Sequence, residues 1–247
     1  MTGSGRRLDD SDDSDDSVLL AFFAAIGTGD DREVTRLLDE VPALATRPVR
    51  VGATRQDPES YFLPAIHHHV YAGDTALHVV AAAHRRRLAS AVVARGADVR
   101  ARNRRGAEPI HYAADGNSGA ICGEPNGQHE LITYLVAVGA DPNAKDNSGV
   151  APIHRAVRTR SSNGVRALIE AGANLLLMNR SGSTPLHLAV QNTGKGGSGS
   201  GPAKDEQRRI IVLLLGHGVR QTDVDANGKT VAAAATSDWI RQLLDSS

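Results

Sequence analysis

Four histidines recur at regular intervals and are the first candidates for chemistry. They are separated by 33, 43 and 33 residues and are His78, His111, His154 and His187. Imidazole is a common zinc ligand. If each histidine belongs to its own layer of stacked helices, however, the rings lie roughly 10 Å apart. Since that distance is too long for a shared ion, the spacing favours a role in the fold over a metal site.

A second group, His67-His68-His69, lies outside this interval. In an extended segment His67 and His69 would face the same side, with His84 as a candidate third ligand. Imidazole ligands suit zinc and related metals. No cysteine pair, H-E-x-x-H motif or suitably spaced carboxylate completes such a site. We therefore predict no metal and interpret these histidines as solvated or packed within a loop.

Two lysines in glycine-containing segments raise the question of a phosphate-binding loop. The P-loop motif is G-x-x-x-x-G-K-[ST]. Asp223 stands at the first glycine position before Gly228-Lys229-Thr230, and Gly196 follows Lys195 where a hydroxyl residue is required. The sequence contains no G-x-S-x-G, and no motif supplies a base to Cys122. We therefore predict no cofactor and assign no catalytic residue.

The recurrent histidines belong to a longer repeating pattern. Each closes a four-residue segment that begins two residues after a glycine, and these segments lie at 75–78, 108–111, 151–154 and 184–187. Glycine tolerates the positive φ of a tight turn. A second marker, Gly-Ala-Asp or Gly-Ala-Asn, begins at residues 96, 139 and 172. Two markers that recur together indicate an internal repeat.

The pattern resembles the ankyrin-repeat family, whose units of about 33 residues contain T-P-L-H-x-A and a later G-A-D. The resemblance covers about residues 70–235 and implies an all-α repeat solenoid. We expect about four to five repeats, each a helix-turn-helix with a β-turn tip, between N- and C-terminal capping helices. In this family the histidine bonds to backbone of a neighbouring unit. The implied structural residues are His78, His111, His154, His187, Gly73, Gly106, Gly149 and Gly182.

The resemblance and the local composition divide the chain into five segments. In chain order we expect an acidic disordered tail (1–17), an N-terminal helical cap (18–46), an irregular loop (47–72), the ankyrin repeats (73–225, with insertions near 116–127 and 193–205) and a C-terminal capping repeat (226–247). The apolar second helices of the repeats are expected at 88–94, 131–138, 165–171 and 210–215. Long loops on a rigid scaffold often carry function.

Ankyrin proteins usually bind partners through the turn tips and the exposed side of the first helices. Matched by repeat register, the partner-binding groove consists of Arg102, Arg104, Arg105, Asp115, Lys145, Asn147, Arg158, Arg180, Gln191, Asn192 and Lys229. Basic residues dominate this set, and a concave basic surface attracts anions. We therefore expect a non-enzymatic interaction scaffold or regulator that binds an acidic protein segment. A solvated charged face without a ligand is the plainer interpretation.

A different hypothesis uses the irregular loops. If the loops at 47–69, 116–127 and 193–201 close over the concave face, they form a pocket for a small anionic ligand or an unusual enzyme. The residues of this alternative pocket are His67, His69, His84, Tyr112 and Arg155, beside the groove arginines. Convergent side chains in an enclosed pocket would favour this hypothesis, whereas an open groove would argue against it.

The balanced charge of the chain hides a contrast between its parts. The first 17 residues hold six of the 28 acidic and two of the 28 basic residues, so residues 18–247 carry 26 basic and 22 acidic residues. The acidic tail is therefore a candidate competitor for the basic groove. A small positive charge and only 3 Phe, 4 Tyr and 1 Trp argue against nucleic acid as the partner.

The cysteine content and hydropathy indicate the compartment. One cysteine cannot form an intrachain disulfide, which favours a reducing environment. The polar, acidic N-terminus differs from a signal peptide. The apolar run at 210–215 is far shorter than the roughly 20 residues that span a bilayer. We expect a soluble, cytoplasmic protein with no membrane segment.

Overall fold

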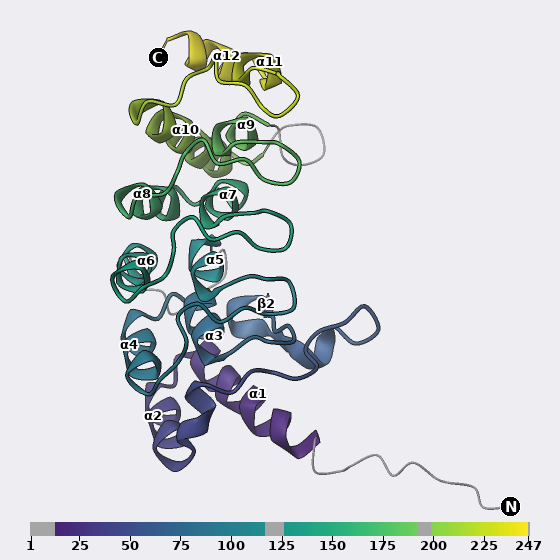
Figure 1. Ribbon diagram of the computed structural model, residues 1–247, viewed down its shortest axis with the longest axis vertical. Helices are drawn as coiled ribbons and strands as arrows, with labels where there is room; N and C mark the ends of the chain where they lie inside the picture. The colour runs from purple at the N-terminus through teal and green to yellow at the C-terminus, as the bar shows by residue number, and fades with distance from the viewer. Residues whose placement is uncertain (1–12, 117–125, 192–198, 247) are drawn as a thin grey trace, which may run out of the picture.

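The computed structural model describes residues 13–116, 126–191 and 199–246. Within these ranges, pairs of helices stack in chain order along the long axis of the molecule, and a loop projects sideways beside each first helix (Figure 1). The first helices are α3 (Ala76–Ala82), α5 (Pro109–Ala114), α7 (Pro152–Arg158), α9 (Pro185–Ala189) and α11 (Val231–Ala234). Their partners are α4 (Arg86–Ala94), α6 (Gly127–Ala137), α8 (Ser162–Glu170), α10 (Gly201–Gly216) and α12 (Asp238–Asp245). The fold is an all-α repeat solenoid, as the sequence predicts.

Local sequence explains where the first helices begin. Pro109, Pro152 and Pro185 occupy the first helical turn, where the missing N–H has no helical partner to lose. Ile110, Ile153 and Leu186, which follow these prolines, are fully buried, as are Leu131 and Leu135 of α6. Each helix pair is too thin to bury its own apolar face, so neighbouring pairs supply the core.

The projecting loops share one construction, seen clearly around Asp146. Its Oδ1 accepts the backbone N–H groups of Ser148 and Val150 at 2.8 and 3.0 Å. Gly149 has φ of 68°, and a Cβ there would lie 3.0 Å from the backbone nitrogen of Arg180 in the next loop. The same positive φ occurs at Gly73, Gly106 and Gly182. These glycines allow consecutive loops to stack closely.

An N-terminal helix pair, α1 (Asp13–Thr28) and α2 (Asp31–Glu40), precedes the repeats. Because α1 begins at Asp13, residues 13–17 belong to a helix and not to the expected disordered tail, of which residues 1–12 lie outside the described residues. Asp16 is buried and accepts the backbone N–H of Arg50 at 3.2 Å. Acidic residues are favoured at a helix N-terminus, which explains why the acidic run continues into α1.

The segment expected to be an irregular loop (47–72) contains local structure. Three short 3-10 helices, η1 (Pro42–Ala45), η2 (Glu59–Tyr61) and η3 (Pro64–Ile66), flank or interrupt it. Strands β1 (Phe62–Leu63) and β2 (His68–His69) pair antiparallel, with Phe62 opposite His69. A separate antiparallel bridge joins Gly52 to Tyr71. We call residues 52–71 the hairpin segment; it lies beside α3 on the side where the loops project (Figure 1).

Both expected insertions fall partly outside the described residues. Residues 117–125, which include Cys122, and residues 192–198 are not described. Residues 201–205, expected within the second insertion, form the start of the 16-residue α10 instead. Ser200 accepts the N–H of Ala203, and proline follows at the first turn, so a capped helix begins earlier than its apolar run indicates. No described helix is long and apolar enough to cross a membrane.

Candidate functional site

The four recurrent histidines connect consecutive repeats. Nδ1 of His111 accepts the N–H of Glu108, and its Nε2 donates to the carbonyl of Val150 in the next repeat, both at 3.1 Å. The corresponding carbonyl acceptors are Ala107 for His78, Leu177 for His154 and Lys229 for His187. Burial lowers the pKa of His111 to about 4, which keeps this ring neutral at physiological pH. Each of these rings therefore makes its hydrogen bonds within the fold.

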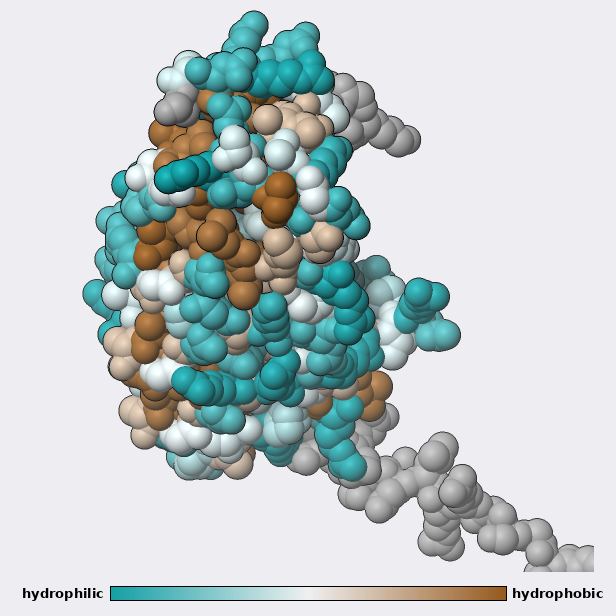
Figure 2. Space-filling model, turned by 45° about the horizontal axis from the view of Figure 1, so that its top comes forward, coloured by the Kyte–Doolittle hydropathy of each residue, from teal (hydrophilic) through white to brown (hydrophobic). Residues whose placement is uncertain are grey.

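A pocket of about 690 Å³ lies between two projecting loops and the ends of α5 and α7. We call it the basic pocket. It is lined by Arg104, Arg105, Asp115, Asp146, Asn147, Ser148, Val150, Arg155, Arg158 and Thr159. Five of these residues belong to the groove predicted from the sequence, and Arg155 belongs to the alternative set. Hydrophilic residues gather on the right of Figure 2, on the side where the loops project.

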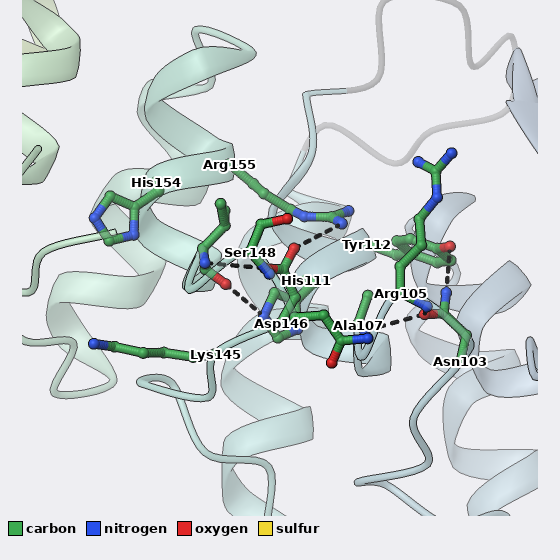
Figure 3. A network of polar contacts seen from close by, with 12 residues as sticks. Asn103, Arg105, Ala107, His111, Tyr112, Lys145, Asp146, Ser148, His154 and Arg155 are labelled. Carbon is green, nitrogen blue, oxygen red and sulfur yellow. Dashed lines mark hydrogen bonds and ion pairs between the residues drawn. The ribbon is translucent and has the colours of Figure 1, made fainter. Parts of the chain in front are cut away.

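Arg155 is the arginine of the basic pocket whose charge is already compensated. Its Nη1 lies 3.0 Å from Oδ2 of Asp115, and its Nη2 lies 3.7 Å from Oδ2 of Asp146. Burial raises the pKa of Asp115, and the positive charge of Arg155 opposes that rise. Figure 3 shows Arg155 reaching from α7 toward Asp146. Arg155 therefore connects a first helix to a loop and leaves little charge for a ligand.

Arg104 and Arg105 are held by the hairpin segment. The guanidinium of Arg105 lies 3.8 Å from the centre of the Tyr71 ring, and that of Arg104 lies 5.3 Å from it. Arg104 also donates to the carbonyl of Ala53. A guanidinium over an aromatic face is attracted by the ring quadrupole. The hairpin segment thus holds the side chains of Arg104 and Arg105, both of which line the basic pocket.

The uncompensated charge of the basic pocket comes from three arginines. Among the described residues, no carboxylate forms an ion pair with Arg104, Arg105 or Arg158, and all three are exposed. Burial raises the pKa of Asp115, and Arg158 is near enough for its positive charge to oppose that rise, as the charge of Arg155 does. Four guanidinium groups and two carboxylates line the pocket, so its formal charge is +2.

A second pocket, of about 360 Å³, shares Arg104 and Arg105 with the basic pocket. Its remaining lining comes from the hairpin segment: Ala53, Thr54, Arg55, Pro58, His69 and Tyr71. The two arginines therefore face a continuous surface made by the repeats on one side and by the hairpin segment on the other. The repeat register selected none of these hairpin residues, and His69 alone was predicted, as part of the alternative pocket.

The other predicted groove residues lie outside the basic pocket. Arg102 donates to the carbonyl of Lys145 at 2.7 Å, and Nζ of Lys145 donates to the carbonyl of Met178 at 3.2 Å. In Figure 3 the Lys145 side chain points away from Arg155. Arg180 and Lys229 are exposed on later loops, and Gln191 lines a third pocket of about 220 Å³, which shares Arg158 with the basic pocket. Asn192 lies outside the described residues.

The residues of the alternative pocket are spread over several places. His67 has φ of 47°, so the segment is not extended there as the two-histidine arrangement requires. His67 is exposed, His69 lies against Phe62 in the second pocket, and His84 is buried at the end of α3. In the described parts of the chain, no group of three His, Cys, Asp or Glu side chains is arranged to hold a metal.

Tyr112 belongs to a buried polar network beneath the basic pocket. Only 2% of its surface is exposed, and its hydroxyl accepts from Asn103 at 2.8 Å and donates to Asp74 at 3.3 Å. Burial raises the pKa of Tyr112 well above its usual value. His68, which sequence reasoning did not select, stands edge-on to this ring at 4.6 Å between centres. Tyr112 does not line the basic pocket, and its ring centre lies 5.4 Å from the guanidinium of Arg155, which does.

Asp146 and Val150 line the basic pocket but were not selected as site residues from the sequence. The position of Asp146 in a turn accounts for the hydrogen bond that its Oδ1 accepts from Ser148. It does not account for the contact of its Oδ2 with Arg155.

In comparisons with known proteins, residues 119–197 match the family model for ankyrin repeats, in 3 copies. No curated protein matches the chain. The matched range includes the α7 side of the basic pocket, and the same helix-pair arrangement continues on both sides of it.

Proposed function

Because the chain is an ankyrin-repeat protein, and ankyrin repeats are generally protein-interaction modules, we propose that it binds an acidic segment of a partner protein. The basic pocket is the binding site, and the protein acts as a non-enzymatic scaffold or regulator. One observation carries this proposal: Arg104, Arg105 and Arg158 line one pocket and have no carboxylate partner among the described residues.

The chemistry of arginine supports an acidic segment. A guanidinium presents a planar set of donors that matches a carboxylate, and charge-assisted hydrogen bonds of this kind contribute about 1.5–3 kcal/mol each. Arginines that line a recess also raise the local concentration of anions. Arg155 serves a different purpose, since Asp115 and Asp146 neutralise it. We place this binding in a reducing, cytoplasmic compartment because the chain has 1 cysteine.

A small anionic ligand is the second candidate. The volume of the basic pocket, about 690 Å³, falls within the range of pockets that hold small molecules. The protein segment is preferred because Arg104 and Arg105 also face the second pocket, so the basic surface continues beyond one enclosed site.

Affinity capture from native lysate, followed by mass spectrometry, tests the proposal. We compare the wild type with an Arg104→Ala/Arg105→Ala/Arg158→Ala variant. The matched control changes three exposed arginines outside the basic pocket, Arg32, Arg87 and Arg166, to alanine. We expect an acidic protein that the wild type and the control retain and the pocket variant loses. Equal retention by the pocket variant would exclude the pocket as the binding site.

A further inference from the structure

We propose that the acidic group received by the basic pocket is a phosphate monoester, carried by a phosphorylated serine or threonine of the partner segment. This inference rests on the proposed function and makes its ligand specific. It is carried by the charge of the pocket, by the two elements that supply its three arginines without a carboxylate partner among the described residues, and by the contacts that hold two of these arginines in place.

The charge of the pocket matches a dianion. Asp115 and Asp146 both contact Arg155, so three guanidinium groups remain and the formal charge of the lining is +2. An aspartate or glutamate side chain would supply one negative charge and leave the rest uncompensated. A phosphorylated serine carries about −1.5 to −2 at neutral pH and compensates the pocket almost fully.

The free arginines approach from two different elements. Arg104 and Arg105 lie on the loop before α5, whereas Arg158 is the last residue of α7. A carboxylate has two coplanar oxygens and is well matched by one guanidinium. A phosphate monoester offers three oxygens in a tetrahedral arrangement, so donors can approach it from several directions at once. Arginines from two elements that line one pocket therefore suit phosphate better than carboxylate.

Two of the three arginines are held before a ligand arrives. Arg105 lies over the Tyr71 ring, and Arg104 donates to the carbonyl of Ala53. Ordering a long, flexible side chain during binding costs about 0.5–1.5 kcal/mol, and contacts that already hold it reduce that cost. The hairpin segment thus orders the side chains of Arg104 and Arg105 before a ligand binds. In this way a segment that departs from the repeat pattern contributes to recognition.

Retention on peptide libraries tests this inference. Three immobilised libraries share degenerate flanking positions and carry a central phosphoserine, glutamate or serine. We expect about tenfold more of the purified full-length protein on the phosphoserine library than on the glutamate library. Equal retention on those two libraries overturns the inference and leaves the proposed function standing. Retention on none of them overturns both.

Variants and a free anion identify the site and the source of the phosphate. Arg158→Gln should abolish the preference for phosphoserine over glutamate, whereas Arg166→Gln, on the exposed side of α8, should preserve it. Thermal unfolding checks that both variants are folded. Free O-phosphoserine should compete with the phosphoserine library far more weakly than a soluble phosphopeptide does. Equal competition by O-phosphoserine would show a small-molecule site and overturn the assignment to a protein segment.

Discussion

Arginines of the same pocket have different roles, and their partners decide which. Arg155 is committed to Asp115 and Asp146, while Arg158 has no carboxylate partner among the described residues. The side chain of Arg155 is 17% exposed and that of Asp146 is 9% exposed, so both members of this contact are largely withdrawn from water. The charge of Arg155 therefore contributes to the stability of the folded protein, whereas the charge of Arg158 contributes to binding.

Substituting these two arginines separates stability from binding. Arg155→Gln leaves two carboxylates without their cation, and we expect it to lower the free energy of unfolding by about 1–2 kcal/mol. Arg158→Gln should change that free energy by less than about 0.5 kcal/mol. Urea denaturation followed by circular dichroism measures both. Equal effects of the two substitutions would contradict the assignment of separate roles.

The repeat histidines make stability depend on pH. The pKa of His111 is lowered to about 4 in the folded protein, so between that value and the usual 6.5 the unfolded chain binds more protons. Stability must therefore fall as the pH drops through this window. Burial raises the pKa values of Asp74, Glu108 and Asp115, and these groups act in the opposite direction.

Comparison of the wild type with His111→Gln isolates the contribution of the histidine, because the carboxyl groups remain in both proteins. We expect the stability advantage of the wild type to shrink by about 2 kcal/mol between pH 7.5 and pH 5. Urea midpoints at the two pH values provide the measurement. An advantage that stays constant would show that His111 is not held neutral.

At the scale of elements, the hairpin segment decides the shape of the binding surface. It brings Tyr71 under Arg105 and supplies the lining of the second pocket. These contacts join residues of an irregular segment to a repeat loop, and no regular ankyrin position encodes them. The binding surface therefore depends on an element that lies outside the repeat pattern.

Two substitutions at Tyr71 test this dependence. Tyr71→Phe keeps the aromatic face beneath Arg105, so acidic peptides should bind as they do to the wild type. Tyr71→Leu removes that face, and the loss of about 0.5–1 kcal/mol should weaken binding about two- to fivefold. Fluorescence anisotropy with a labelled glutamate-rich peptide reports the affinity. Wild-type affinity in the leucine variant would mean that the ring does not position Arg105.

The elements show which features could be predicted from the sequence. The all-α solenoid followed from glycine, histidine and proline positions, because these residues act through bonds within a repeat or to the next one. The Asp146–Arg155 contact and the position of Tyr71 could not be predicted. They depend on how a loop and a hairpin pack in space. The early start of α1 was missed because its first turns are acidic and lack an apolar pattern.

At the scale of the whole molecule, opposite charges lie in different parts of one chain. Asp9, Asp10 and Asp12 precede the described residues, whereas the basic pocket lies among the repeats. A fully extended segment of 12 residues spans about 40 Å, so its reach is comparable with the size of a small domain. Charge alone thus makes these residues a candidate competitor for the pocket.

Removal of the acidic residues tests this competition. We expect deletion of residues 1–12 to tighten the binding of a glutamate-rich peptide at low salt, because one source of negative charge is lost. A variant with Asp9, Asp10 and Asp12 changed to asparagine should tighten binding at least as much, because Arg6 and Arg7 remain in it. The difference should vanish at high salt, where charges are screened. Unchanged affinity at low salt would leave this segment without a role in binding.

The most direct test of the proposed function is an anisotropy titration of a labelled glutamate-rich peptide over a series of salt concentrations. The wild type and the Arg32→Ala/Arg87→Ala/Arg166→Ala control should bind it, with an affinity that falls as salt rises. The Arg104→Ala/Arg105→Ala/Arg158→Ala variant should bind at least about tenfold more weakly at low salt. If the pocket variant binds as tightly as the control, the basic pocket is not the site of an acidic partner.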